Sequence, residues 1–252
     1  MAKLIEYFNP NWRDILHNAK LDNFEAIWNL EFDWFEEPNI RRGGWSGVIK
    51  YPLNTTKGIT DIFIKRQENH ISKTLRHPIK GIATFQKEFH NIQALTQKKA
   101  PTLELVYFGQ RDQQAILITQ SLDAYCALDS TELYTLDLPQ KPSLLTRVAA
   151  AMRLLHQHHF QHNCLYPKHI FVSNTDKGWD VKFIDLEKLK RTPLKRQAVI
   201  RDLFTLYRHA DKHWTTKDRV YFFKAYMNEN KLSPKSKKLW HSIAKKIAAK
   251  NK

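Results

Sequence analysis

The residues best suited to chemistry lie in the second half of the chain. Residues 156–172 read His-Gln-His-His-Phe-Gln-His-Asn-Cys-Leu-Tyr-Pro-Lys-His-Ile-Phe-Val, and an apolar run then leads to Asp185. The carboxylate of Asp185 is a hard oxygen ligand of the kind that Mg²⁺ prefers, whereas the imidazole of His169 is a softer ligand. The thiol of Cys164 reacts only after it has lost its proton. These groups could hold a metal ion and take part in proton transfer beside it.

A glycine-rich turn stands in the first half of the chain, where residues 42–47 read Arg-Gly-Gly-Trp-Ser-Gly. The backbone N–H groups of a glycine-rich hairpin can approach the phosphates of a nucleotide closely. The candidate phosphate-binding residues here are Gly43, Gly44, Ser46 and Gly47. A Gly-Gly pair is also common in ordinary turns, so this segment alone does not establish a nucleotide site.

A lysine and a glutamate follow the glycine-rich turn at spacings that suit phosphate binding. Lys65 ends the β-like run 59–65, where an ammonium group can pair with nucleotide phosphates and with a helix carboxylate. Glu88 is the only acid in the expected helix 84–96, so we expect it to be the partner of Lys65. Phe63 lies two positions before Lys65, and we expect it to face the same side of the strand and to narrow the space there.

Hydrophobic periodicity places these residues on an α+β framework. Strand pairs are expected at 47–51 with 59–65, at 103–108 with 115–119, and at 170–172 with 181–184. Helices are expected within 1–35, at 84–96, from 142, and at 200–209, 218–227 and 235–249. We therefore expect an N-terminal lobe over residues 1–120, with a helical, aromatic-rich extension at 1–35. A helical C-terminal lobe that ends in a basic helix should follow over 121–252.

Residues 155–170 carry the most specific pattern, and we call this segment the catalytic loop. It aligns without a gap with the catalytic loop of protein-kinase-like phosphotransferases. The matching residues are Leu155, His156, His162, Leu165, Pro167 and Ile170. Cys164 falls on the catalytic Asp of the pattern, and His169 falls on an Asn that holds a second metal ion. Asp185 falls on the metal-bridging Asp, and Asp202 on an anchoring Asp at the start of a large-lobe helix.

Residues 161–171 and 184–188, together with the loop 42–47, resemble the lipopolysaccharide core kinase superfamily. That group includes the bacterial heptose and Kdo kinases and the InaA-like proteins, and the resemblance covers roughly residues 40–210. It implies a bilobal protein-kinase-like fold with a small antiparallel β lobe, one helix in that lobe, and a larger helical lobe. It also implies transfer of the ATP γ-phosphate, with Mg²⁺, to a heptose or Kdo-like sugar of the lipopolysaccharide core at the cytoplasmic face of the inner membrane.

The resemblance also implies roles for individual residues. Catalytic roles fall to Cys164, Asp185 and Lys65, and metal binding falls to Asp185 and His169. Nucleotide contacts are expected from Gly43, Gly44, Ser46, Gly47, Lys65, Glu88, Gln120 and Lys168. Gln120 ends the apolar run 116–119, which resembles the last strand of the small lobe, so the backbone there would bond an adenine ring.

Cys164 and His169 depart from the kinase pattern and leave the activity open. A positioned carboxylate base contributes about 10²–10⁴-fold to proton transfer, and a neutral thiol is a poor substitute. Cys164 could serve if a cation such as Lys168 lowered its pKa. Imidazole is a poor ligand for Mg²⁺, so His169 could instead contact a phosphate or be a buried structural residue. Two interpretations follow: an active sugar kinase, or a pseudokinase that acts as a nucleotide-binding or regulatory module.

The net charge of +16 indicates anionic partners. Residues 231–252 contain eight lysines and no acid, and apolar residues recur within them at helical spacing. This segment is either an amphipathic helix at an anionic inner-membrane surface or a helix docked on the protein with a solvated lysine face. Aromatic residues are not interleaved with the basic ones as on a nucleic-acid platform, so a nucleic-acid partner is the least favoured alternative.

The cysteine content and the lack of long apolar segments indicate where in the cell the protein is expected. Two cysteines, Cys126 and Cys164, form no disulfide framework and favour a reducing compartment. The N-terminus lacks a signal-peptide core, and no apolar run is long enough to span a membrane. We therefore expect a cytoplasmic protein, with the inner-membrane surface as a peripheral location and lipopolysaccharide core or another phosphorylated glycan as substrate.

Overall fold

The computed structural model describes residues 3–41, 43–56, 58–74, 77–137, 139–210 and 214–250. The chain divides into two compact units. The first comprises residues 1–94 and 103–123, and the second comprises residues 95–102 and 124–252. A mainly β unit therefore precedes a mainly helical one, as the α+β expectation requires.

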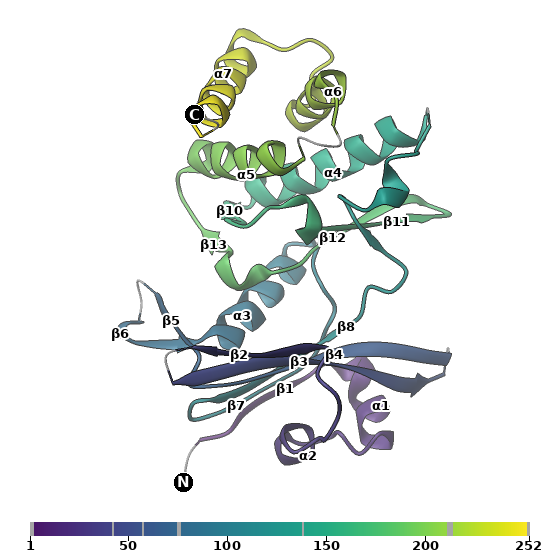
Figure 1. Cartoon of the computed structure of the whole chain (residues 1–252), viewed down its shortest axis with the longest axis vertical. Helices are drawn as coiled ribbons and strands as arrows, with labels where there is room; N and C mark the ends of the chain where they lie inside the picture. The colour runs from purple at the N-terminus through teal and green to yellow at the C-terminus, as the bar shows by residue number, and fades with distance from the viewer. Residues whose placement is uncertain are drawn as a thin grey trace. The chain divides into compact units, whose positions relative to one another are not determined.

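The first unit is built on a six-stranded antiparallel sheet with the order β1-β7-β8-β4-β3-β2 (Figure 1). Its strands are β1 (Ile5–Phe8), β2 (Glu36–Arg41), β3 (Gly44–Thr55), β4 (Gly58–Glu68), β7 (Leu105–Arg111) and β8 (Gln114–Gln120). Both expected hairpins of this unit are present, as β3 with β4 and as β7 with β8. Along β4, Ile62 and Ile64 are buried in the core and alternate with Phe63 and Lys65 on the opposite face.

One helix, α3 (Thr84–Gln97), follows the sheet strands β2–β4 and agrees with the expected helix 84–96. The ring of Phe89 on this helix stacks on that of Phe108 in β7, with 4.2 Å between centroids. A small hairpin that the sequence did not reveal, β5 (Ile71–Thr74) with β6 (His77–Ala83), precedes the helix.

The N-terminal segment is not helical throughout, which corrects the expectation for residues 1–35. Ile5–Phe8 forms the edge strand β1 of the sheet. Its backbone N–H and C=O groups pair with those of β7, a strand that is far away in the sequence and would otherwise be an open edge. A 3₁₀ turn at Pro10–Trp12 and two short helices, α1 (Arg13–Asn18) and α2 (Phe24–Trp28), follow. Their buried side chains share one core with the sheet, and these are Trp12, Leu16, Phe24 and Ile27. The extension is therefore part of the first unit and completes its core.

The second unit contains four longer helices: α4 (Gln140–Gln157), α5 (Lys195–His209), α6 (Thr216–Met227) and α7 (Pro234–Ala248). The strands β9 (Cys126–Ala127), β11 (Ile170–Thr175) and β12 (Gly178–Phe183) form a small sheet, and β10 (Phe160–Gln161) pairs with β13 (Lys190–Arg191). Helix α5 begins at Lys195, five residues before the expected helix 200–209. Asp202 therefore lies within the helix and not at its start, which corrects the expectation. The first three residues of α5, Lys195, Arg196 and Gln197, are polar and exposed, so apolar periodicity did not reveal the start of the helix.

The basic helix α7 is docked on its own unit. Ile243 is fully buried, and the ring of Trp240 contacts those of Tyr207 and Phe223 at centroid distances of 5.3 and 5.2 Å. The apolar stripe is therefore already covered, which supports the docked-helix interpretation over a membrane-inserted helix. In the described part of the chain, no helix has both the length and the apolar character needed to cross a bilayer.

Candidate functional site

The glycine-rich turn joins β2 to β3, and glycine is required at its positions for different physical reasons. Gly43 has φ +76°, a left-handed conformation that favours glycine. A Cβ on Gly44 would collide with the backbone carbonyl of Asn69, and one on Gly47 would collide with the ring of Trp34. Close packing within the unit therefore accounts for both of these glycines, whatever ligand the loop holds. Ser46 is half-buried on β3, and Arg42 lies outside the described residues.

Lys65 and Glu88 form the ion pair that their spacing predicts. Lys65 Nζ lies 2.8 Å from Glu88 Oε1, and the carboxylate side chain is only 4% exposed. A buried carboxylate needs such a partner, because leaving it unpaired costs about 3–5 kcal/mol of stability. The pair therefore fixes Lys65 on β4 with its ammonium group beside α3.

Two further residues of this unit show how space is arranged near Lys65. Phe63 shares the Lys65 face of β4, as expected, and its ring contacts that of Phe35 at 5.2 Å between centroids. Gln120 ends β8, but its N–H already donates to the carbonyl of Glu104 at 3.0 Å. That N–H is not available to an adenine ring, so the expected backbone contact from Gln120 would need a different atom.

In the second unit, Asp202 holds the catalytic loop in place. Its carboxylate is fully buried and accepts the backbone N–H groups of His162 at 2.7 Å and Asn163 at 3.0 Å. Its Oδ2 also lies 3.2 Å from His156 Nε2. Asn163 has φ +69°, an uncommon conformation for a side-chain-bearing residue, and these bonds hold it there. Asp202 therefore has the anchoring contacts that the alignment implied.

His162 connects the catalytic loop to the segment after β12 that carries Asp185. Its Nε2 donates to the carbonyl of Ile184 at 3.1 Å, and burial lowers the pKa of the imidazole. Burial thus favours the neutral form of the ring, and its Nδ1 has no hydrogen-bond partner among the described residues. This bond fixes the position of the loop relative to the residue just before Asp185.

Cys164 is buried, and burial raises the pKa of its thiol above the ordinary value. The cation that opposes this shift is Lys188, not Lys168, which is exposed. Lys188 was missed from the sequence, although it follows Asp185 closely within the segment Asp-Leu-Glu-Lys. Because the raised pKa keeps the thiol protonated at neutral pH, Lys188 does not turn Cys164 into a base.

Asp185 and His169 lie side by side, as the alignment expected. His169 Nδ1 is 2.8 Å from the carbonyl oxygen of Cys164 and 3.3 Å from Asp185 Oδ2. A carbonyl only accepts, so Nδ1 carries a proton and is not itself a metal ligand. Asp185 has φ +56°, and left-handed non-glycine residues of this kind concentrate at functional sites.

The donor set around Asp185 fits Mg²⁺ bound together with a phosphate ligand. Mg²⁺ commonly takes only one or two protein carboxylates and completes its shell with phosphate oxygens and water. The Asp185 side chain is 30% exposed and can offer its carboxylate in this way. Within the described ranges, no three His, Cys, Asp or Glu side chains gather into a group that could hold a metal ion.

The antiparallel sheet unit with its Lys–Glu pair and the helical unit with its anchored catalytic loop define a protein-kinase-like phosphotransferase fold. Two solved structures resemble the chain: "WaaP in complex with acyl carrier protein" (TM-score 0.68, 19% identity, 98% of each chain) and an aminoglycoside-3'-phosphotransferase of type VIII (TM-score 0.53, 11% identity, 94% of this chain and 99% of the other). The model of the lipopolysaccharide kinase (Kdo/WaaP) family matches residues 25–226, and the chain belongs to that family.

A curated relative agrees with this assignment. Protein InaA of Escherichia coli (strain K12) is 29% identical over 205 residues, which cover 77% of this chain and 91% of the relative. The expected resemblance to the lipopolysaccharide core kinase superfamily and the expected kinase-like fold are therefore both confirmed.

Proposed function

We propose that this member of the lipopolysaccharide kinase family transfers the γ-phosphate of ATP to a heptose or Kdo-like sugar of the lipopolysaccharide core. The ion pair between Lys65 and the buried Glu88 carries the proposal, since a lysine fixed in this way suits nucleotide phosphates. The acceptor is a phosphorylated glycan, and the +16 charge of the chain suits such a polyanion. The reaction takes place at the cytoplasmic face of the inner membrane.

Candidate residues for binding the nucleotide occur on each of the two units. In the first unit, Lys65 contacts the phosphates, and the turn that contains Gly43, Gly44, Ser46 and Gly47 covers them. In the second unit, Lys168 of the catalytic loop is a further cation for the nucleotide. When bound, ATP supplies the phosphoryl group and Mg²⁺ neutralises charge on its oxygens. Asp185 would hold the metal ion, while His169 orients Asp185 through its contacts with that carboxylate and with the carbonyl of Cys164.

The acceptor side lacks a strong base. Cys164 stands where a carboxylate would take the proton of the sugar hydroxyl, and burial keeps its thiol protonated. Phosphoryl transfer depends mostly on positioning and charge neutralisation, so the missing base slows the reaction by about 10²–10⁴-fold rather than abolishing it. The raised pKa of Cys164 also favours a second candidate function, that of a pseudokinase which binds the nucleotide without transfer.

A transfer assay tests the proposal and separates it from the second candidate. Purified protein and the variants Cys164→Asp and Asp185→Ala are incubated with Mg²⁺, labelled ATP and deacylated lipopolysaccharide core. We expect slow labelling by the native chain, faster labelling by Cys164→Asp and none by Asp185→Ala. Binding of ATP without labelling by either the native chain or Cys164→Asp would establish the pseudokinase instead. No labelling and no nucleotide-dependent rise in melting temperature would refute both.

A further inference from the structure

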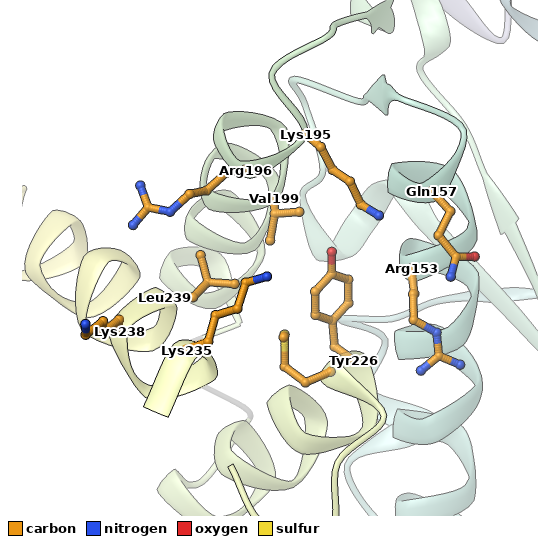
Figure 2. A pocket seen from close by; sticks show the side chains of 10 residues that line it. Arg153, Gln157, Lys195, Arg196, Val199, Tyr226, Lys235, Lys238 and Leu239 are labelled. Atoms are coloured by element: carbon orange, nitrogen blue, oxygen red, sulfur yellow. The ribbon is translucent and has the colours of Figure 1, made fainter. Parts of the chain in front are cut away.

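A cavity of about 660 Å³ lies among the four longer helices of the second unit (Figure 2). We call it the basic cavity, because its described lining contains five cationic side chains and no acidic one. The cations are Arg153, Lys195, Arg196, Lys235 and Lys238. The volume is within the range of about 300–1,000 Å³ that small-molecule sites occupy. The described lining contains none of the residues assigned above to the nucleotide or the metal ion, and it shares only Gln157 with the catalytic loop.

Carboxylates do not neutralise these cations. In the described part of the chain, none of the five takes part in an ion pair. Arg153 instead donates to the carbonyl of Ala225 at 3.0 Å, and Arg196 donates to the hydroxyl of Ser242 at 3.1 Å. These bonds orient the guanidinium groups and leave their charge in place. Figure 2 shows Lys195 of α5 and Lys235 of α7 extending from opposite sides toward Tyr226.

The backbone adds positive charge to the same place. Lys195 and Arg196 are in the first turn of α5, Lys235 is in the first turn of α7, and neither first turn contains an acid. The N-terminus of a helix carries a partial positive charge, and each cation there is unfavourable by about 0.3–1 kcal/mol. Two helices that face one cavity thus both carry cations, not acids, at their N-termini. Such departures from the favoured charge pattern are typical of functional sites, and a bound anion would relieve the repulsion between the cations and the helix N-termini.

The floor of the basic cavity is apolar. Val199 is 5% exposed, Tyr226 is 5% exposed, and Leu239 is half-buried beside them. A fully hydrated inorganic ion would leave this surface uncovered, whereas a ligand with an apolar part would bury it. The lining therefore selects for an anion attached to an apolar carrier.

We propose that the basic cavity binds a phosphate ester with an apolar carrier. The phosphate contacts Lys195, Lys235 and Arg153, and the carrier packs on Val199 and Leu239. A phosphate with two negative charges suits this cluster better than a single carboxylate, because each added cation strengthens the charge-assisted bonds. Such a group is found in the headgroup of a membrane phospholipid and in soluble alkyl phosphates. The proposal does not depend on the kinase activity of the chain.

The experiment uses the full chain and two sources of the same chemistry. Binding is measured to monomeric decyl phosphate by calorimetry and to phosphatidylcholine vesicles, with and without phosphatidic acid, by sedimentation. The cavity variant is Lys195→Gln with Lys235→Gln. The matched control is Lys237→Gln with Lys245→Gln, two exposed lysines of α7 outside the cavity lining, so both proteins lose the same charge.

We expect the native chain and the control to bind, and the cavity variant to bind at least about tenfold more weakly. Binding of decyl phosphate with this pattern identifies a soluble ligand, and binding only to vesicles that contain phosphatidic acid identifies a lipid headgroup. Equal weakening in both variants would show that net charge alone drives binding and would overturn the proposal. The absence of binding to both probes by the native chain would overturn it as well.

Discussion

A single buried carboxylate determines the conformation of the catalytic loop. Asp202 accepts two backbone N–H groups of the loop and lies beside His156, whose other ring nitrogen is 2.8 Å from the hydroxyl of Tyr226. The chain Tyr226–His156–Asp202 therefore joins three helices to one strained loop. Loss of the negative charge would leave buried N–H groups with a weaker acceptor.

We predict that Asp202→Asn destabilises the protein by about 1–3 kcal/mol, because an amide has one acceptor oxygen where the carboxylate has two. Urea unfolding followed by circular dichroism measures the change. Asp176→Asn, in an exposed turn, serves as the control and should shift stability by less than about 0.5 kcal/mol. Equal effects of the two substitutions would show that the loop does not depend on Asp202.

The glycines of the turn between β2 and β3 provide a second comparison at the scale of single residues. Gly47→Ala places a methyl group against the Trp34 ring and should destabilise the protein by about 1–3 kcal/mol. Gly43→Asn should cost less than about 1 kcal/mol, since Asn tolerates the left-handed region and the structure describes no atom within 4 Å of an added Cβ. Thermal unfolding compares the two, and a larger loss in Gly43→Asn would contradict this account of the loop.

At the scale of elements, the start of α6 shows how one side chain joins two helices. Thr215 and Asp218 form a capping box, and Asp218 also pairs with Lys141 of α4 at 2.8 Å. Burial acts to raise the pKa of Asp218, but the bonds from Lys141 and Thr215 outweigh it and hold that pKa below its ordinary value. The ionised form of Asp218 is therefore stabilised in the folded state.

A pH dependence follows from this lowered pKa. The stabilisation is complete above the unfolded pKa of about 3.9 and is lost as the pH falls through the lower folded pKa. Asp218→Asn should reduce the free energy of unfolding by about 1 kcal/mol at neutral pH, and by less in acid. Urea unfolding at neutral and acidic pH measures both values. A difference between the native chain and the variant that stays constant with pH would contradict the assignment to Asp218.

At the scale of the whole molecule, the elements that local sequence patterns mark were predicted better than the pairings between distant segments. Alternation along 59–65 and helical spacing along 84–96 gave the strands and the helix that bring Lys65 and Glu88 together. The edge strand at Ile5–Phe8 could not be predicted, because its partner β7 lies a hundred residues away in sequence and no local signal marks the pair. For the same reason Lys168 was expected beside Cys164, whereas the folded loop places Lys188 there.

The family assignment and the altered acceptor side together define what must be tested. The central claim is that the chain retains a functional nucleotide and metal site, with Asp185 as the metal ligand. Calorimetry of ATP binding with and without Mg²⁺ tests it in the native chain, in Asp185→Asn and in the exposed-turn control Asp176→Asn. Asn keeps the left-handed backbone accessible at position 185, so the substitution removes mainly the charge.

The variant Lys195→Gln with Lys235→Gln is measured alongside, so that phosphate binding in the basic cavity is not mistaken for binding at the nucleotide site. The account predicts Mg²⁺-dependent ATP binding by the native chain, the control and the cavity variant, and at least about a tenfold loss in Asp185→Asn. Binding that is independent of Mg²⁺ and unchanged in Asp185→Asn would contradict it, as would the absence of binding by the native chain.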